Sequence, residues 1–411
     1  MLRLLALSLV AAAALALAGP ASANTYCVAA PGCAGSPAGD VQSGLNAAQQ
    51  HAGADTVKVG PGTFTASGLG FGYYDPAVGN AVTVVGAGPG KTTLTTTAFD
   101  SATVLSLEHG SSVRDVHLAV PAAPLDQGLA LNGASGRNVT VDGSANTGAV
   151  LRQGATLAGS NIAGTVGIDI LGGGSTVLNT HVTSGPIGIR LLGETTFTRL
   201  QRLRIDATNG GNQPAAIGLQ VECGRVALED SVVDVRGAQP AGTGVAVTPD
   251  QCTAGTVNSA EVRQSTIVGS GAGSNGVVAR SDDPVFAAAA NVTNSIVRGF
   301  QHSVDREAIG GIAFMATDAS TYPSKGKIDI TLSGGTGTLT ETAHTTFDPM
   351  FVNEAAGKFQ LAAGSPLIDG GNADGLAPGE SNVDKAGLPR ILDGNADGIA
   401  RRDVGAFEFK P

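Results

Sequence analysis

The phrase that decides the fold of this chain is Gly167-Ile-Asp-Ile-Leu171, which returns almost unchanged as Gly188-Ile-Arg-Leu-Leu192. A glycine followed by alternating apolar and variable residues recurs every 19 to 32 residues. The other copies begin at Gly128, Gly148, Gly218, Gly244 and Gly276. Each copy is short, rich in aliphatic residues and followed by Gly, Asn or another polar residue, which is typical of a β-strand rather than a helix.

A second apolar phrase lies between the copies of the first, as in Ser160-Asn-Ile, Ser231-Val-Val and Asn294-Ser-Ile-Val. Two strand phrases per period indicate a solenoid, because stacked coils bury an apolar face that one strand cannot bury alone. We predict an all-β fold, a right-handed parallel β-helix with adjacent strands about 4.8 Å apart. A β-sandwich or barrel is the alternative, but it would not require the same phrases to recur in the same order.

The alternation within each phrase assigns side chains to the two faces of a strand. Residues one and three after the glycine should point inward, and residues two and four should point outward. The first outer row is Ala130, Val150, Asp169, Arg190, Gln220, Ala246 and Val278. The second outer row is Asn132, Arg152, Leu171, Leu192, Glu222, Thr248 and Arg280.

Composition and charge exclude several classes of partner. The 411 residues include 60 Gly and no Trp, and 42% are hydrophobic, which suits tight corners around a thin core. The formal net charge is −10 and no Lys/Arg cluster is seen, which argues against nucleic acid and anionic membrane surfaces. A polyanionic sugar would need a bridging cation. The length suggests two or three domains, but a solenoid grows without separate cores. We also expect a monomer.

The N-terminus predicts export. A positive start, Met1 to Arg3, precedes an apolar run from Leu4 to Ala18, and Ala21-Ser-Ala23 is a cleavage signal. We expect a signal peptide at residues 1–23 and a secreted or cell-surface protein without a membrane span after cleavage. A retained membrane anchor is the alternative, for which the apolar run is short.

Export permits disulfides, and four Cys allow three pairings. Cys27 and Cys33 are six residues apart in a Gly/Pro-rich segment, which predicts a local bridge. Cys223 and Cys252 each follow an outward-facing phrase on consecutive coils. The solenoid would bring them together, so we predict the bridge Cys223–Cys252.

The two ends of the chain lack the repeated strand phrases of its middle. Residues 24–55 hold one amphipathic helical pattern, with Asp40 as N-cap and Val41, Leu45 and Ala48 as its apolar stripe. Such a helix would cap the open end of a solenoid spanning residues 56–345. Residues 346–411 carry no such repeat and form a separate irregular C-terminal module.

Several of these segments resemble known families. The runs from Asp40 to Phe64 and from Val82 to Leu94 resemble the N-terminal cap and first coils of secreted pectate-lyase-like β-helix proteins. The C-terminal runs 347–352, 359–370 and 403–408 are similar to the choice-of-anchor Q module, which closes predicted bacterial surface β-helix proteins. The resemblance implies architecture, because this fold hosts lyases, hydrolases, adhesins and binding proteins alike.

The outer rows supply the best candidates for chemistry. Asp169, Arg190 and Glu222 form a polar patch, and sugar-active β-helix enzymes use carboxylates with a basic residue on such a face. The alternative is an ion pair between neighbouring strands, worth a few tenths of a kcal/mol. A second weak catalytic candidate is Arg280-Ser-Asp282-Asp283, for which the alternative is a turn before Pro284.

Two loops suggest ligand binding. Phe71, Tyr73 and Tyr74 lie in a Gly-rich insertion where they could stack on sugar rings, or fold back onto the solenoid. A candidate calcium loop has oxygen-bearing side chains at alternate positions and a glycine sixth. Its ligands would be Asp393, Asn395, Asp397, Ile399 (by its backbone carbonyl) and Asp403, with a looser echo at Asp369, Asn372 and Asp374. The alternative is a pair of Asx turns without metal.

The sequence therefore predicts a secreted or surface β-helix that binds extracellular polysaccharide or another surface, without a complete catalytic motif. One alternative is a polysaccharide lyase or glycoside hydrolase acting on the outer face, and another is a structural spacer. A groove on the outer sheet lined by at least two carboxylates and one basic residue would keep the enzyme hypothesis open. A shallow face of Thr, Val and Ala would contradict one.

Overall fold

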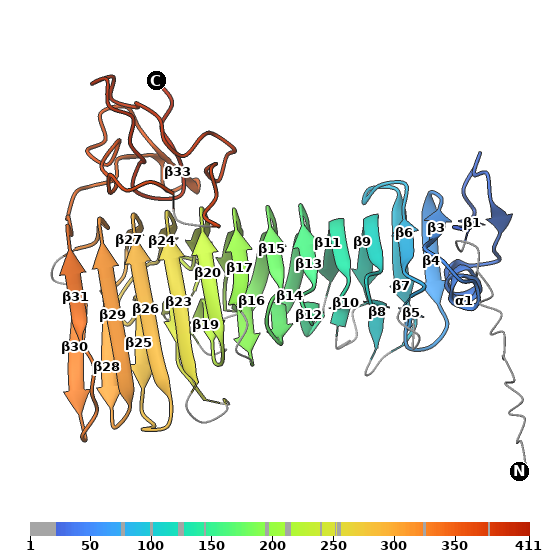
Figure 1. Ribbon diagram of the computed structural model, residues 1–411, viewed down its shortest axis with the longest axis horizontal. Coiled ribbons are helices and arrows are strands. Elements are labelled where there is room, and N and C mark those ends of the chain that lie inside the picture. Colours follow the sequence, from blue (N-terminus) through green and yellow to red (C-terminus); the bar gives the residue numbers. More distant parts are fainter. Residues whose placement is uncertain are drawn as a thin grey trace, which may run out of the picture.

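The computed structural model shows a long rod of stacked coils with its strands crossing the rod axis (Figure 1). It describes residues 22–74, 79–98, 102–121, 127–143, 145–193, 197–209, 215–238, 241–250, 252, 256–323, 326–376 and 379–411. All but two residues of the predicted leader lie outside this part of the chain. Within it, no helix combines the length and apolar character needed to cross a bilayer.

Three ladders of parallel strands form the sides of the coil, and each strand pairs with its counterpart in the next coil. Ladder 1 contains β1 (Thr25–Val28), β3 (Asp55–Val59), β6 (Val82–Val85), the starts of β9 (Ser112–Val120) and β11 (Ser135–Gly143), β13 (Thr156–Ala158), β15 (Thr176–Leu178), β17 (Phe197–Gln201), β20 (Arg225–Glu229), β23 (Val257–Arg263), β26 (Ala287–Thr293), β29 (Ile312–Asp318) and β31 (Leu339–Thr342). Ladder 2 contains β4 (Gly62–Ala66), β7 (Thr92–Thr96), the ends of β9 and β11, the starts of β14 (Asn161–Leu171) and β16 (His181–Leu192), β18 (Arg204–Ala207), β21 (Val232–Asp234), β24 (Thr266–Val268) and β27 (Ile296–Arg298).

Ladder 3 contains β5 (Phe71–Tyr73), β8 (Thr103–Glu108), β10 (Gln127–Asn132), β12 (Thr147–Arg152), the ends of β14 and β16, β19 (Ala216–Val221), β22 (Gly242–Val247), β25 (Asn275–Ser281), β28 (His302–Ile309) and β30 (Lys327–Leu332). The short β2 (Ser36–Pro37) pairs with β1. The prediction of a parallel β-helix is confirmed. In the described chain the one antiparallel strand pair, β32 (Phe351–Asn353) with β33 (Lys358–Leu361), lies outside the coils.

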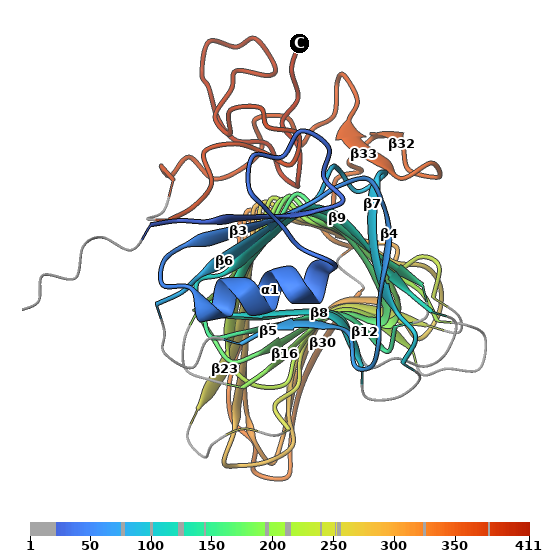
Figure 2. The same cartoon turned by 90° about the vertical axis from the view of Figure 1, so that its right-hand side faces the viewer.

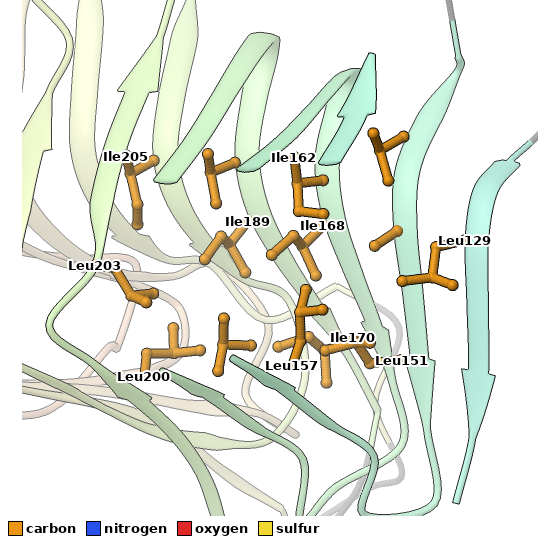
Figure 3. Packing of buried hydrophobic residues seen from close by; sticks show 14 of the residues in the cluster. Leu129, Leu151, Leu157, Ile162, Ile168, Ile170, Ile189, Leu200, Leu203 and Ile205 are labelled. Atoms are coloured by element: carbon orange, nitrogen blue, oxygen red, sulfur yellow. The ribbon is translucent and has the colours of Figure 1, made fainter. Parts of the chain in front are cut away.

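The predicted inward residues line the core. Figure 3 shows Ile168 beside Ile189 in ladder 3, with Leu129 further along the same row, and all three are fully buried. The glycine that opens each phrase is required by close approach at the corner before ladder 3. A Cβ on Gly167 would lie 2.3 Å from a methyl group of Val182 and 2.5 Å from a backbone oxygen on the next coil.

The corner between ladders 1 and 2 is the most regular feature of the coil. One residue there has a positive φ on each coil, as at Asn179 (48°) and Asp230 (50°), and Asn and Asp tolerate this conformation better than most residues. The residue that follows is usually Ser or Thr. The Ser265 hydroxyl accepts the Ser231 N–H from the preceding coil (3.2 Å) and donates to the Arg263 carbonyl (2.8 Å).

The same pair of hydrogen bonds recurs at Ser160, Ser231, Ser295 and Ser320. Ser265→Ala should therefore leave the buried Ser231 N–H without an acceptor and lower the free energy of unfolding by about 1–3 kcal/mol. Urea unfolding followed by circular dichroism measures this. Ser265→Thr is the control, because Thr180 already occupies this position. A comparable loss in the Thr variant, or none in the Ala variant, would contradict the assignment.

The N-terminal end of the rod is covered by α1 (Val41–Gln50), which lies across the lumen (Figure 2). Asp40 caps it, accepting the Ser43 N–H at 2.7 Å. The helix buries Val41, Leu45 and Ala48, the stripe predicted from the sequence. The apolar lumen is thereby shielded from water at this end.

The last coil shields the lumen in a different way, because its inward positions turn polar. Lys327 and Glu341 face each other from β30 and β31 with their Nζ and Oε2 atoms 2.5 Å apart. The Tyr322 hydroxyl donates to Glu341 (2.7 Å), and Arg306 donates to Thr331 (2.7 Å). Inward-pointing charges at a sheet edge prevent edge-to-edge pairing with another chain. We call these five residues the polar lid.

Removing the charges of the polar lid should expose an apolar, unpaired sheet edge. We expect the double variant Lys327→Leu/Glu341→Leu to self-associate in a concentration-dependent way, measured by size-exclusion chromatography with light scattering. The control is Lys91→Leu/Asp142→Leu, which makes the same chemical change at exposed positions far from the end. Equal association of both double variants would contradict a protective role of the lid.

The C-terminal module does not cover the end of the rod, so the expectation that it closes the solenoid is wrong in its placement. It lies along ladder 2, above β20, β24 and β27 (Figure 1). Phe359 and Ala406 of the module pack on Val232 and Val268 of ladder 2. The physical reason is that ladder 2 presents outward apolar side chains there, whereas the last coil presents the polar lid.

A buried arginine joins the module to the coil. Arg390 is fully buried and donates to Asp230 of the corner (2.5 and 2.9 Å) and to Glu408 of the module (2.6 Å). The Asp403 carboxylate lies nearby, accepting the Asp369 N–H (2.7 Å). Burial raises the pKa of Asp230 and of Asp403 to about 6 each, and that of Glu408 to about 8, and the attraction of Arg390 offsets this only in part.

These raised pKa values make stability depend on pH. A carboxyl whose pKa is higher in the folded chain stabilises the fold fully below its unfolded pKa of about 4, and this stability is lost as pH rises through the folded value. We expect the melting temperature to fall between about pH 4 and pH 8. Glu408→Gln should flatten the upper part of this profile. A melting temperature that rises over the same range would contradict the argument.

Candidate functional site

The strand register of ladder 3 confirms the first outer row (row 1) along its length, and the second (row 2) where Asn132 pairs with Arg152 and Leu171 with Leu192. Val150 pairs with Asp169, Asp169 with Arg190, and Arg190 with Gln220, all from successive coils. Row 1 is more buried than its outward direction suggests, since Val150 is 1% exposed, but Val150 is not part of the main core cluster. Small side chains in this row are shielded by the larger neighbours stacked beside them.

Asp169 and Arg190 form the predicted ion pair between neighbouring strands. The Arg190 Nε and Nη2 atoms donate to the two Asp169 carboxylate oxygens at 2.7 and 2.8 Å. This hydrogen bonding raises the pKa of Arg190, with a smaller contribution from Glu222. The pair is bidentate and Asp169 is buried, so its oxygens are committed to Arg190.

A groove opens beside this pair, where β19, β22 and β25 end. It has a volume of about 420 Å³ and is lined by Gln220, Glu222, Thr248, Pro249, Asp250, Arg280 and Asp282. It brings together Glu222 from the first predicted candidate set and Arg280 and Asp282 from the second. Asp250 is fixed there because its N–H donates to the Glu222 carbonyl oxygen at 3.3 Å. The sequence criterion of two carboxylates and one basic residue in a groove is met.

Asp283 does not join this groove. Its Oδ1 accepts the Val285 N–H at 2.8 Å, which is the turn that was the alternative interpretation. Asp282, whose side chain is 63% exposed, projects beside Arg280 at 4.0 Å. Leu171 and Leu192 interrupt row 2 on the other side of Glu222, so the polar groove ends there.

The carboxylates of the groove repel one another in a partly buried setting. The pKa of Glu222 is raised mainly by burial, and Asp250 and Asp169 raise it further while Arg190 lowers it. One coil beyond Arg280, burial and the neighbouring Glu307 raise the pKa of Asp305 to about 7. Both shifts reflect burial first, and neighbouring carboxylates add to its effect while a nearby arginine opposes it.

Three acidic residues in or near the groove were not among the candidates predicted from the sequence: Asp250, Asp305 and Glu307. Asp250 lies in the loop after β22, whose path no repeat predicts. Asp305 and Glu307 lie on β28, which extends both outer rows by one coil through the pairs Val278 with Asp305 and Arg280 with Glu307. The signal was present as alternation in Val304-Asp-Arg-Glu, but no glycine marks the start of this copy.

The predicted aromatic stack is wrong for two of its three residues. Phe71 and Tyr73 are 3% and 2% exposed and belong to the core, because β5 directs both side chains inward. Tyr74 points outward and is 58% exposed, at the far end of ladder 3 from the groove. A single exposed tyrosine does not form an aromatic platform.

One of the two predicted disulfides is present. Cys27 and Cys33 are bonded, with their Cα atoms 6.0 Å apart. Cys223 and Cys252 are free thiols, so the predicted Cys223–Cys252 bridge is wrong for this structure. The two thiols are neighbours, but the Cys252 sulfur is directed to the Glu222 carbonyl oxygen (2.9 Å) and to Asn258 (3.3 Å). Burial and the Cys223 sulfur raise the pKa of Cys252 to about 12.

The candidate calcium residues are not assembled as a ligand set. Asp393, Asn395 and Asp397 direct oxygens to N–H groups of their own loop, at 2.8 to 3.1 Å, as in the Asx-turn alternative. Asp403 is 1% exposed and is held by other backbone N–H groups.

The second candidate set is likewise committed to neighbouring groups. Asp369 accepts N–H groups from residues 394 and 395, and Asn372 bonds Asn294. Asp374 receives a hydrogen bond from Asn372. Across the described residues, no group of three or more His, Cys, Asp or Glu side chains is placed to hold a metal. Calcium binding at the Asp393 loop stays a prediction. It requires the carboxylate and amide oxygens of this loop to give up their bonds to backbone N–H groups and bind the ion instead.

Comparison with known proteins identifies the fold but no family. No family model and no curated protein matches the sequence. Among solved structures, pectate lyase Pel9A is similar with a TM-score of 0.53 at 14% identity, over 95% of this chain and 98% of that one. The alginate lyase from Paenibacillus sp. str. FPU-7 has a TM-score of 0.41 at 12% identity, over 74% and 97%. The likeness to pectate lyase Pel9A, at this low identity, concerns the fold alone.

Proposed function

We propose that this chain is an exported protein that binds an extracellular polysaccharide in the groove of ladder 3. The observation that carries the proposal is the convergence of carboxylate, amide, hydroxyl and guanidinium groups from three successive coils in one hollow of about 420 Å³. Sites for small ligands span about 300–1,000 Å³ and use a few convergent polar groups. The likeness to pectate lyase concerns the fold, so the proposal rests on the groove itself.

Export is supported by the leader-like N-terminus and by the Cys27–Cys33 disulfide, which persists in oxidising surroundings. The C-terminal module, which resembles a choice-of-anchor Q module, would then hold the rod at a cell surface. Its position along ladder 2 leaves the outer face of ladder 3 free for a long ligand (Figure 2). Calcium at Asp393 is part of the proposal for this module and plays no role in the groove.

Hydrolysis is the second candidate function, and one observation favours it. Glycoside hydrolysis needs two carboxyl groups, one of them with a raised pKa, and burial raises the pKa of Glu222, which lies in the same groove as Asp250. Binding is preferred because Arg280, the basic residue of the groove, is engaged with Glu307 (3.4 Å) and Asp282. β-Elimination has less support, since it acts on uronates, which this acidic groove repels.

Glycan binding should depend on the carboxylates of the groove and not on their neighbours. We expect Glu222→Gln and Asp282→Asn each to weaken binding about tenfold or more, because a hydrogen bond to a charged group contributes about 1.5–3 kcal/mol. A glycan array followed by calorimetry with the best oligosaccharide measures this. Asp283→Asn is the matched control, since it lies one residue away and retains its turn acceptor.

New reducing ends that appear with the wild type and disappear with Glu222→Gln would assign hydrolysis instead of binding alone. Binding without product supports the proposal as stated. If the array binds no glycan at any of several pH values, both the binding and the hydrolysis proposals are overturned. A structural spacer is then the remaining hypothesis.

A further inference from the structure

The groove holds more negative charge than its arginines compensate. Its lining carries Glu222, Asp250 and Asp282 against Arg280 alone. Arg280 is shared with Glu307 on the next coil (3.4 Å), and Arg190 on the other side is committed to Asp169. A ligand that enters this groove therefore meets a field that favours positive charge.

Two buried acceptors on row 1 also lack a hydrogen-bond donor among the described residues. They are the Gln220 Oε1 atom in the groove and the Asp305 Oδ1 atom, which lies three coils further on, beyond the lining of the groove. Asp305 is only 4% exposed, so this carboxyl has left water without gaining a donor. A buried polar group without a partner is costly, and a ligand that brings N–H or O–H donors to this row would relieve that cost.

The size and chemistry of the hollow restrict what that ligand is. A single metal ion would need several ligating side chains, and the described chain offers no group of three or more. A polyuronate would bring further carboxylates to a site already rich in them. An ammonium group on a sugar ring supplies one positive charge and three donors, while the ring hydroxyls suit the Gln220 amide and the Thr248 hydroxyl.

We propose that the ligand of this groove is a cationic polysaccharide, one whose sugar rings carry free amino groups. This inference rests on the proposed function and names its substrate class. Glu222 and Asp250 receive the ammonium group, and Gln220 and Thr248 bind the neighbouring hydroxyls. Arg280, held by Glu307, excludes a second amino group from the distal end of the groove.

The test compares oligosaccharides that differ only in charge, with the complete mature chain. Calorimetry is run with the β-1,4 glucosamine hexamer, with its fully N-acetylated counterpart, and with galacturonate hexamer with and without calcium. We expect the glucosamine hexamer to bind at least tenfold more tightly than the N-acetylated one, and to weaken as salt increases. Glu222→Gln and Asp250→Asn should each reduce this preference severalfold, while Asp283→Asn leaves it unchanged.

Each other outcome overturns the inference in a distinct way. Equal affinity for the N-acetylated hexamer leaves the groove a glycan site but removes the requirement for a free amino group. Tighter binding of galacturonate with calcium identifies a cation-bridged uronate. Equal weakening by Asp283→Asn and Asp250→Asn shows a diffuse attraction outside the groove. Failure of all these probes and of neutral oligosaccharides removes the proposed function as well.

Discussion

The rod depends on one constraint, the tight corner between ladders 1 and 2. On successive coils a residue with positive φ turns the chain from ladder 1 into ladder 2. A hydroxyl group from the next coil then accepts the backbone N–H of the residue that follows. A corner without these hydroxyls would bury unpaired backbone groups, which folded proteins avoid. Because the corner fixes the register of each coil against the next, it also fixes the rows of side chains on the outer face.

The C-terminal module follows a different principle. Apart from the β32–β33 hairpin, its described part has little regular secondary structure, and carboxylates replace it as partners for the backbone. Asp384 accepts the N–H groups of residues 386, 388 and 408, and Asp403 accepts those of residues 369 and 409. A module built in this way tolerates irregular loops, but it buries ionisable groups whose protons then matter to its stability.

The sequence predicts the features that recur on every coil, and it does not predict features that occur only once. Rows 1 and 2 follow from alternation alone, and the register places Asp169 beside Arg190 as expected. The groove also needs Asp250, which lies in a loop of unrepeated length. Beyond the groove, row 1 continues to Asp305, on a strand copy that lacks its marker glycine. The Cys223–Cys252 bridge failed for a related reason, since stacking brings the residues close without orienting their sulfurs.

The two ends of the rod differ in kind, one covered by a helix and the other finished by charged side chains turned toward the lumen. In the described part of the chain the helix covers the lumen at one end and inward charges occupy it at the other, so we expect both ends to disfavour the addition of another rod. New coils are tolerated only by duplication within the interior, where the corners are interchangeable. Such an event would lengthen the rod and shift the groove relative to the helix by a whole number of strand spacings, without altering its chemistry.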